Sequence, residues 1–288
     1  MAITVEQRQY LTYILEDEAV NALLEVVPER GGIITRWQVQ GQELLYLDAE
    51  RFANPELTVR GGIPILFPIC GNLPDHTYSY QGQTYTLKQH GFARDLPWEV
   101  LEQTATDRLS LTLGLSSNLQ TWAVYPFDFH LAFTYVLQAN TLTLHQRYTN
   151  QSAEAMPFAI GFHPYFGVED KSALQFQIPA TEWLDQRTKA TQPYSGAFDW
   201  SADEIDVAFT ELSSQVATVT DTQRSRRLTL HSSPAFSTLV FWTVKGKDFY
   251  CLEPWTAPRN ALNTGERLLY LAPGASLETS VTCTIELI

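Results

Sequence analysis

Two segments of the chain place arginine and histidine beside glycine-containing bends, where side chains of these types can bind a polar ligand. Arg60 precedes Gly61-Gly62 and an apolar, proline-containing stretch, which would hold its guanidinium in a defined place. His90 and Arg94 flank Gly91, and an imidazole next to a planar guanidinium fork suits a polyhydroxylated or anionic ligand. Taken singly, the first segment is better explained by a surface arginine before an ordinary loop, and the second by a structural histidine.

Two further segments carry groups that can move protons. His163 lies among aromatic residues and directly before Pro164, which favours an extended backbone there. Glu253 follows an apolar run and precedes Pro254-Trp255, and burial of a carboxylate would raise its basicity. Aromatic walls around a few titratable groups are typical of sugar-binding sites. The plainer alternatives are a core histidine and a glutamate at the rim of the fold.

The elements that must position these residues are predicted to be strands. Val, Ile, Thr, Tyr, Phe and Trp dominate the periodic segments. Three hairpins are predicted, with turns at Gln40-Gly41, Gln81-Gly82 and Ala139-Asn140. Further strands are predicted at 108–115, 226–231, 236–244 and 277–287, and short helical turns near 49–54 and 201–207. We therefore expect an all-β fold, a single large antiparallel sandwich over residues 1–288 with few short helices.

Composition narrows the classes of partner. The chain has 288 residues and a net charge of −13, which disfavours nucleic acid and anionic membrane surfaces. No apolar run is long enough to cross a bilayer and no secretory signal is evident, so a soluble, cytoplasmic protein is expected. Cys70, Cys251 and Cys283 form no paired motif, and the histidines show no metal-binding spacing. We expect no metal and no cofactor; the oligomeric state is left open.

In combination and in this order, the four segments resemble the aldose 1-epimerase (galactose mutarotase-like) superfamily. They read Arg-Gly-Gly-Ile-Pro, His-Gly-Phe-Ala-Arg, Gly-Phe-His-Pro-Tyr-Phe and Glu-Pro-Trp. The chain looks most similar to the hexose-6-phosphate mutarotase-like branch, in which a tryptophan, here Trp98, follows the second segment. A fifth, weaker match is the Asp-x-x-Phe segment that begins at Asp206. The resemblance implies the galactose mutarotase-like supersandwich.

The resemblance also implies a reaction and a set of roles. Members interconvert the α and β anomers of an aldose without a metal or a redox cofactor. By resemblance, Glu253 matches the base that takes the C1 hydroxyl proton, and His163 matches the acid that protonates the ring oxygen. His90 matches a second histidine near that oxygen, and Arg60 and Asp206 match positions that hold the sugar. Arg94 is the candidate for binding a 6-phosphate, unless it pairs with Asp95 or Glu99.

Two other classes of function remain open at this point. One is a non-catalytic carbohydrate-binding or regulatory protein on the same fold, because a fold does not determine a function. The other is a glycoside hydrolase that would use Asp206 and Glu253 as its two carboxylates. The remaining histidines, His76, His130, His145 and His231, are assigned structural or surface positions.

Overall fold

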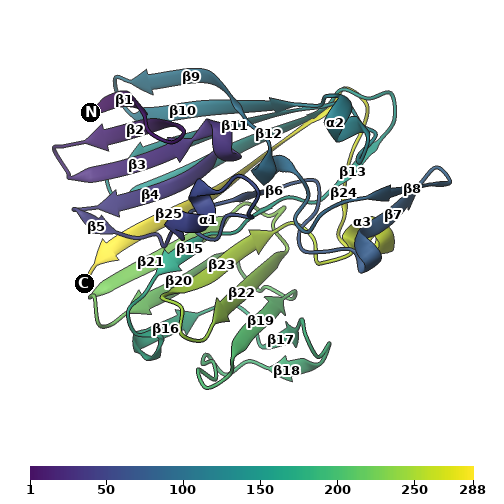
Figure 1. Cartoon of the computed structure of the whole chain (residues 1–288). Coiled ribbons are helices and arrows are strands. Elements are labelled where there is room, and N and C mark those ends of the chain that lie inside the picture. The colour runs from purple at the N-terminus through teal and green to yellow at the C-terminus, as the bar shows by residue number, and fades with distance from the viewer.

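A computed structural model describes all 288 residues and confirms the antiparallel β-sandwich with few short helices (Figure 1). The N-terminal strands form a five-stranded sheet in which each strand pairs with the next one along the chain. These strands are β1 (Ala2–Gln7), β2 (Leu11–Asp17), β3 (Ala22–Val27), β4 (Ile33–Val39) and β5 (Gln42–Glu43). The predicted turn at Gln40-Gly41 joins β4 to β5, and both of its residues have positive φ.

The first of two eight-stranded sheets has the order β16-β20-β21-β25-β12-β11-β10-β9. Its members are β9 (Glu99–Ala105), β10 (Leu109–Ser116), β11 (Phe129–Gln138), β12 (Thr141–Asn150), β16 (Leu174–Gln177), β20 (Val216–Asp221), β21 (Arg226–Ser232) and β25 (Ser276–Leu287). The predicted hairpin at Ala139-Asn140 is confirmed as β11–β12. The C-terminal strand β25 lies in the middle of this sheet, between β12 and β21 (Figure 1).

The second eight-stranded sheet has the order β18-β17-β19-β22-β23-β14-β6, with β15 also paired to β23. Its members are β6 (Ile65–Leu66), β14 (Gly161–Phe162), β15 (Tyr165–Gly167), β17 (Glu182–Asp185), β18 (Thr191–Pro193), β19 (Glu204–Phe209), β22 (Thr238–Val244) and β23 (Phe249–Trp255). Two small two-stranded sheets complete the strands. One is the hairpin of β7 (Thr77–Tyr80) and β8 (Gln83–Thr86), and the other pairs β13 (Met156–Phe158) with the distant β24 (Leu269–Leu271).

A continuous apolar core joins the two eight-stranded sheets. Phe133 of β11 packs against Phe162 of β14, and Phe176 of β16 packs edge-on against Phe241 of β22. Alternate residues of β19, including Ile205 and Val207, point into the same core. Because side chains alternate across a strand, the intervening residues of β19, β22 and β23 are left for the opposite face of the sheet.

The helices are short, as expected: α1 (Ala49–Ala53), α2 (Leu119–Trp122) and α3 (Ala261–Thr264), with 3₁₀ turns η1 (Pro28–Arg30), η2 (Pro74–His76), η3 (Ala93–Asp95) and η4 (Lys171–Ala173). The helical turn predicted near 49–54 is confirmed as α1, which Asp48 caps at its N-terminus. None of these helices has the length and apolar character that crossing a membrane requires.

The helical turn predicted at 201–207 is wrong. Asp199 accepts hydrogen bonds from the backbone and hydroxyl of Ser201, which makes a tight turn rather than a helix. Strand β19 then begins at Glu204, and its residues alternate between buried and partly exposed positions up to Val207. The segment from Glu204 onwards therefore pairs with β22 as a strand instead of forming a helical turn.

Candidate active site

A polar cavity of about 440 Å³ opens on the face of the second eight-stranded sheet that is turned away from the core. All six predicted site residues line it: Arg60, His90, Arg94, His163, Asp206 and Glu253. None of His76, His130, His145 and His231 lines this cavity. Segments far apart in the sequence are thus brought to one place, although the roles of their residues remain predictions.

Strand register explains how the acidic side of the cavity is assembled. Asp206 of β19 is directly opposite Trp242 of β22, and Trp242 is directly opposite Cys251 of β23. Directly opposed residues of neighbouring strands share a face, and so do residues two apart on one strand. Asp206, Trp242 and Glu253 therefore point the same way, as does Glu204, which also lines the cavity.

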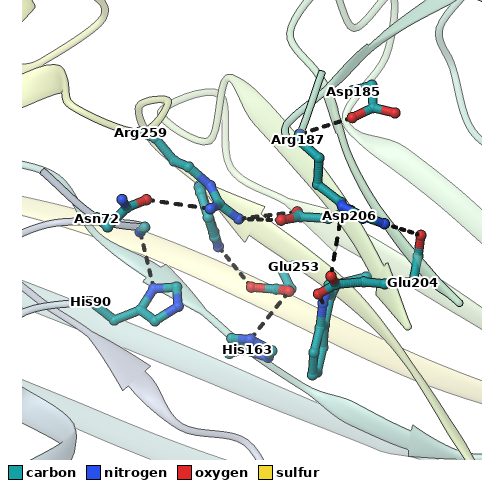
Figure 2. A network of polar contacts seen from close by, with 12 residues as sticks. Asn72, His90, His163, Asp185, Arg187, Glu204, Asp206, Glu253 and Arg259 are labelled. Carbon is teal, nitrogen blue, oxygen red and sulfur yellow. Dashed lines mark hydrogen bonds and ion pairs between the residues drawn. The ribbon is translucent and has the colours of Figure 1, made fainter. Parts of the chain in front are cut away.

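Glu253 is buried, with 1% of its surface exposed, and has two polar neighbours (Figure 2). Its Oε2 accepts a hydrogen bond from the Trp255 indole N–H at 3.2 Å, and its Oε1 lies 3.4 Å from Nε2 of His163. Burial raises the pKa of the Glu253 carboxyl well above its ordinary value, and the charge of Asp206 adds to this effect. The result is a carboxylate with increased basicity, rather than the rim glutamate of the plainer alternative.

The aromatic surroundings of His163 fix the plane of its ring. The imidazole stacks on Tyr165 with ring centroids 4.7 Å apart, and Trp242 meets it edge-on at 5.7 Å. Its backbone N–H donates to the Pro64 carbonyl, while Nδ1 is buried without a partner. Burial, together with the charge of Arg94, lowers the pKa of His163 well below its ordinary value. Burial thus favours the neutral form of both His163 and Glu253.

His90 is held by its own backbone turn. Its φ is 66°, its backbone N–H donates to the Gly71 carbonyl at 2.7 Å, and its Nδ1 accepts from the Gly71 N–H at 3.0 Å. Because Nδ1 is the acceptor, the neutral ring carries its proton on Nε2. Burial lowers the pKa of His90, so this neutral tautomer persists at neutral pH and can donate one hydrogen bond to a ligand.

The position of Arg60 depends on the glycines that follow it in the sequence. The Arg60 guanidinium lies over the Trp242 ring, 5.5 Å from its centroid. Gly62 has φ +63°, and a Cβ there would lie 2.2 Å from the Ile34 carbonyl oxygen. Glycine is thus required for the chain to pass this close to β4 and present Arg60 to the cavity.

Arg94 donates from Nη2 to the Gln89 carbonyl at 2.8 Å, and its Nε is buried without a partner. The indole N–H of Trp98 bonds to the Ala93 carbonyl at 2.9 Å, so this tryptophan braces the η3 segment that carries Arg94. The Arg94 side chain is therefore held by backbone contacts, and not by Asp95 or Glu99 as in the alternative.

Sequence reasoning missed several residues of the cavity. Arg259 binds Asp206 through two contacts of 2.8 and 3.0 Å, and Arg51 and Lys88 add positive charge to the lining. Arg259 lies only six residues after Glu253, but the turn that directs it back towards β19 has no signature in the sequence. Arg51 was assigned only to a short helix, since nothing in its neighbours indicates a ligand.

Three buried side chains could present ligand atoms to a metal ion. The ligand atoms of His163, Cys251 and Glu253 lie within 4.8 Å of one another. A thiol binds metals as the thiolate, and burial raises the pKa of Cys251 well above its ordinary value. The three ligand atoms are close enough to share a metal ion, but the Cys251 thiol resists the deprotonation that metal binding requires. We therefore assign no metal to these residues.

Comparison with known proteins finds a family model, solved structures and curated relatives that are similar to this chain. A family model described as aldose 1-epimerase matches residues 14–284. The Slr1438 protein from Synechocystis sp. PCC 6803 is 47% identical, with a TM-score of 0.95 over 100% of this chain and 99% of that chain. A galactose mutarotase-like protein from Clostridium acetobutylicum, 18% identical, shares the fold with a TM-score of 0.84 over 100% and 99%. A Salmonella typhimurium relative named "Putative glucose-6-phosphate 1-epimerase" is 30% identical over 57% of this chain and 51% of its own.

Proposed function

The chain belongs to the aldose 1-epimerase family, and from this premise we propose that it is a mutarotase acting on a hexose or hexose 6-phosphate. The observation that carries the proposal is the buried contact of 3.4 Å between Glu253 and His163 inside a polar cavity. Interconversion of anomers requires one base and one acid at the two oxygens of a single carbon. A carboxylate and an imidazole in contact can supply both.

The proposed reaction moves two protons and breaks one bond. Glu253 takes the proton of the C1 hydroxyl while His163 delivers a proton to the ring oxygen O5. The C1–O5 bond then breaks and leaves a C1 aldehyde and an O5 hydroxyl. After rotation about C1–C2, the O5 hydroxyl attacks the other face of the aldehyde, and the two protons return. Each positioned acid or base contributes roughly 10²–10⁴-fold in rate.

Other lining residues are proposed to hold the sugar. The Nε2–H of His90 is free to donate to O5 as negative charge develops there, because its Nδ1 is occupied by Gly71. Asp206 can accept from sugar hydroxyls, and Arg60 can donate to them. The rings of Tyr165 and Trp242 offer apolar surface near His163.

The finer part of the proposal is a preference for the phosphorylated sugar. Arg51, Arg60, Lys88 and Arg94 line the cavity, and their guanidinium and ammonium groups form none of the ion pairs that the structure contains. Four positive charges without carboxylate partners are unusual in a chain with a net charge of −13. An anion such as a 6-phosphate would supply the missing partner, and the name of the Salmonella relative agrees with this preference.

The test compares kcat/KM for glucose and for glucose 6-phosphate in the wild type and in Arg94→Ala. One charge-assisted contact favours the phosphorylated sugar by roughly one to two orders of magnitude. Arg94→Ala should therefore reduce kcat/KM for glucose 6-phosphate about 10–100-fold, while kcat/KM for glucose changes little. An equal loss on both sugars would remove the phosphate from the proposal and leave a general aldose mutarotase.

The alternative functions are less well supported by this geometry. A hydrolase that used Asp206 as its second carboxylate would need that group free, but Arg259 binds both of its oxygens. A non-catalytic sugar-binding protein would have no need for the buried pair of Glu253 and His163. Release of reducing sugar from a glycoside would distinguish a hydrolase from a mutarotase.

We further propose that the enzyme works in the cytoplasm. Cys70, Cys251 and Cys283 are all unpaired and buried, which agrees with a reducing compartment.

A further inference from the structure

Arg259 is the one arginine or lysine of the cavity that forms an ion pair with a carboxylate of the cavity, and no predicted role accounts for it. Its Nη2 lies 2.8 and 3.0 Å from the two carboxylate oxygens of Asp206, and its Nη1 lies 3.3 Å from the Asn72 side-chain oxygen (Figure 2). We propose that Arg259 is a positioning residue: it orients Asp206 towards the substrate and offsets the charge of Asp206 beside Glu253. This inference rests on the proposed function and extends it to a residue without an assigned role.

The path of the Arg259 side chain shows that the fold accommodates it specifically. Arg259 lies in the turn between β23 and α3, and its aliphatic stem crosses directly over Gly71. A Cβ on Gly71 would lie 2.3 Å from Cγ of Arg259, so a glycine is needed beneath the stem. The same Gly71 holds both the backbone and the ring of His90. One glycine thus supports the arginine and one of the proposed catalytic histidines.

The charges around Glu253 give the ion pair a chemical consequence. The ionisable groups that face Glu253 lie on several elements: Asp206, Arg259, His163, Tyr165, Arg94, Cys70 and Cys251. Asp206 raises the pKa of Glu253, whereas Arg259 and Arg94 lower it. Arg259 also lowers the pKa of His163. In the intact ion pair, the opposite effects of Asp206 and Arg259 on the pKa of Glu253 largely offset each other. Removal of one member leaves the charge of the other uncompensated.

Removal of each member should therefore shift the titration of Glu253 in opposite directions. In Arg259→Gln, the Asp206 charge stands alone, so the pKa of Glu253 and that of His163 should rise by roughly half to one pH unit. In Asp206→Asn, the Arg259 charge stands alone, and the pKa of Glu253 should fall by a similar amount. The double variant should titrate close to the wild type. A purely structural arginine would not produce shifts of opposite sign.

The measurement is an NMR titration of ¹³C-labelled glutamate and ¹⁵N-labelled histidine in the protein without sugar. Glu253→Gln and His163→Asn assign the two signals. Arg147→Gln removes an exposed guanidinium of β12 outside the cavity and should leave both titrations unchanged. Because no substrate is present, a wild type without mutarotase activity would refute the proposed function but would leave this result interpretable.

Kinetics test the orienting part of the inference. Arg259→Lys keeps the charge, but its single nitrogen cannot take the places of both Nη2, which contacts Asp206, and Nη1, which contacts Asn72. It should raise KM several-fold and leave the Glu253 titration near that of the wild type. An unchanged KM would overturn the orienting role. An unchanged or lowered pKa of Glu253 in Arg259→Gln would overturn the electrostatic role. If Arg259→Gln does not fold, Asp206→Asn provides the test instead. In that variant, a Glu253 pKa that does not fall would overturn the same role.

Discussion

At the scale of single residues, the chemistry depends on Glu253 and His163, two buried groups whose pKa values are both shifted in favour of the neutral form. Burial raises the pKa of Glu253 from 4.5 and lowers that of His163 from 6.5, so each group resists its charged form. Their contact at 3.4 Å lets one proton serve the pair, and its titration belongs to the pair rather than to either residue. The proposed reaction uses the form of the pair in which His163 holds this proton and Glu253 is ionised, because His163 is the acid and Glu253 is the base.

The pH dependence of kcat/KM should therefore be bell-shaped. At low pH the pair holds two protons and has no base, and at high pH it holds none and has no acid. Because the two groups share one proton, each limb reports the titration of the pair rather than that of Glu253 or His163 alone. Because the pKa of Glu253 is raised, the pair should keep its last proton to higher pH than an exposed glutamic acid would. Initial rates of mutarotation between pH 4 and pH 10 test this profile.

The variant His163→Asn tests the contribution of His163 to this pH profile. Without the imidazole, most of the rate enhancement should be lost, and the residual activity should fall only at low pH, where Glu253 becomes protonated. His145→Asn, an exposed position on β12, should keep the complete bell. An active His163→Asn variant with an unchanged alkaline limb would assign that limb to another group.

Residue types and their local neighbours named five of the residues that line the cavity, and the resemblance named a sixth, Asp206, but neither predicted the contacts among them. Glu253 and His163 are far apart in the chain, and only the pairing of β23 with β14 and β15 brings them together. The Arg259–Asp206 pair was missed for the same reason, because it depends on a turn and on the absence of a side chain at Gly71. Such contacts follow from register, which local patterns do not specify.

At the scale of elements, the segment from Gly62 to Pro64 braces the site. The Gly62 carbonyl accepts the backbone N–H of Tyr165, and the Pro64 carbonyl accepts that of His163. The same segment places Arg60 over Trp242. The stretch from Arg60 to Pro64 therefore supports three residues of the cavity, Arg60, His163 and Tyr165.

Gly62→Ala should destabilise the fold by about 2 kcal/mol or more, because a Cβ at φ +63° would also meet the Ile34 carbonyl oxygen. Gly82→Ala is the matched control: its φ is +77° in the β7–β8 turn, but no atom lies within 4 Å of the added Cβ. It should cost only about 1 kcal/mol of backbone strain. Free energies of unfolding from urea titration compare the two variants, and equal losses would contradict the close-approach argument.

Strands and hairpins were the elements best predicted from sequence, because alternation and turn residues are local signals. The turns at Gln81-Gly82 and Ala139-Asn140 are found where predicted. The helical turn predicted at 201–207 was wrong because residues from Glu204 to Val207 alternate between partly exposed and buried positions, which is the period of a strand.

At the scale of the whole molecule, the acidic chain surrounds a cavity with a concentrated group of unpaired cations. A net charge of −13 would repel an anionic substrate at long range. The local arginines reverse this effect close to the site, where the screening length in physiological salt is about 8 Å. The overall fold was predictable from strand content, whereas the sheet order, which interleaves strands from both ends of the chain, was not. That residues 1–288 form a single domain stays a prediction.

The most direct test of the central claim is polarimetry of freshly dissolved α-glucose and α-glucose 6-phosphate with the wild type and Glu253→Gln. The substitution keeps the shape of the side chain and removes its basicity. The wild type should speed the approach to anomeric equilibrium, and Glu253→Gln should return the rate almost to the spontaneous one. Glu278→Gln, an exposed position on β25, should match the wild type. A Glu253→Gln variant that kept most of the wild-type acceleration would contradict the account.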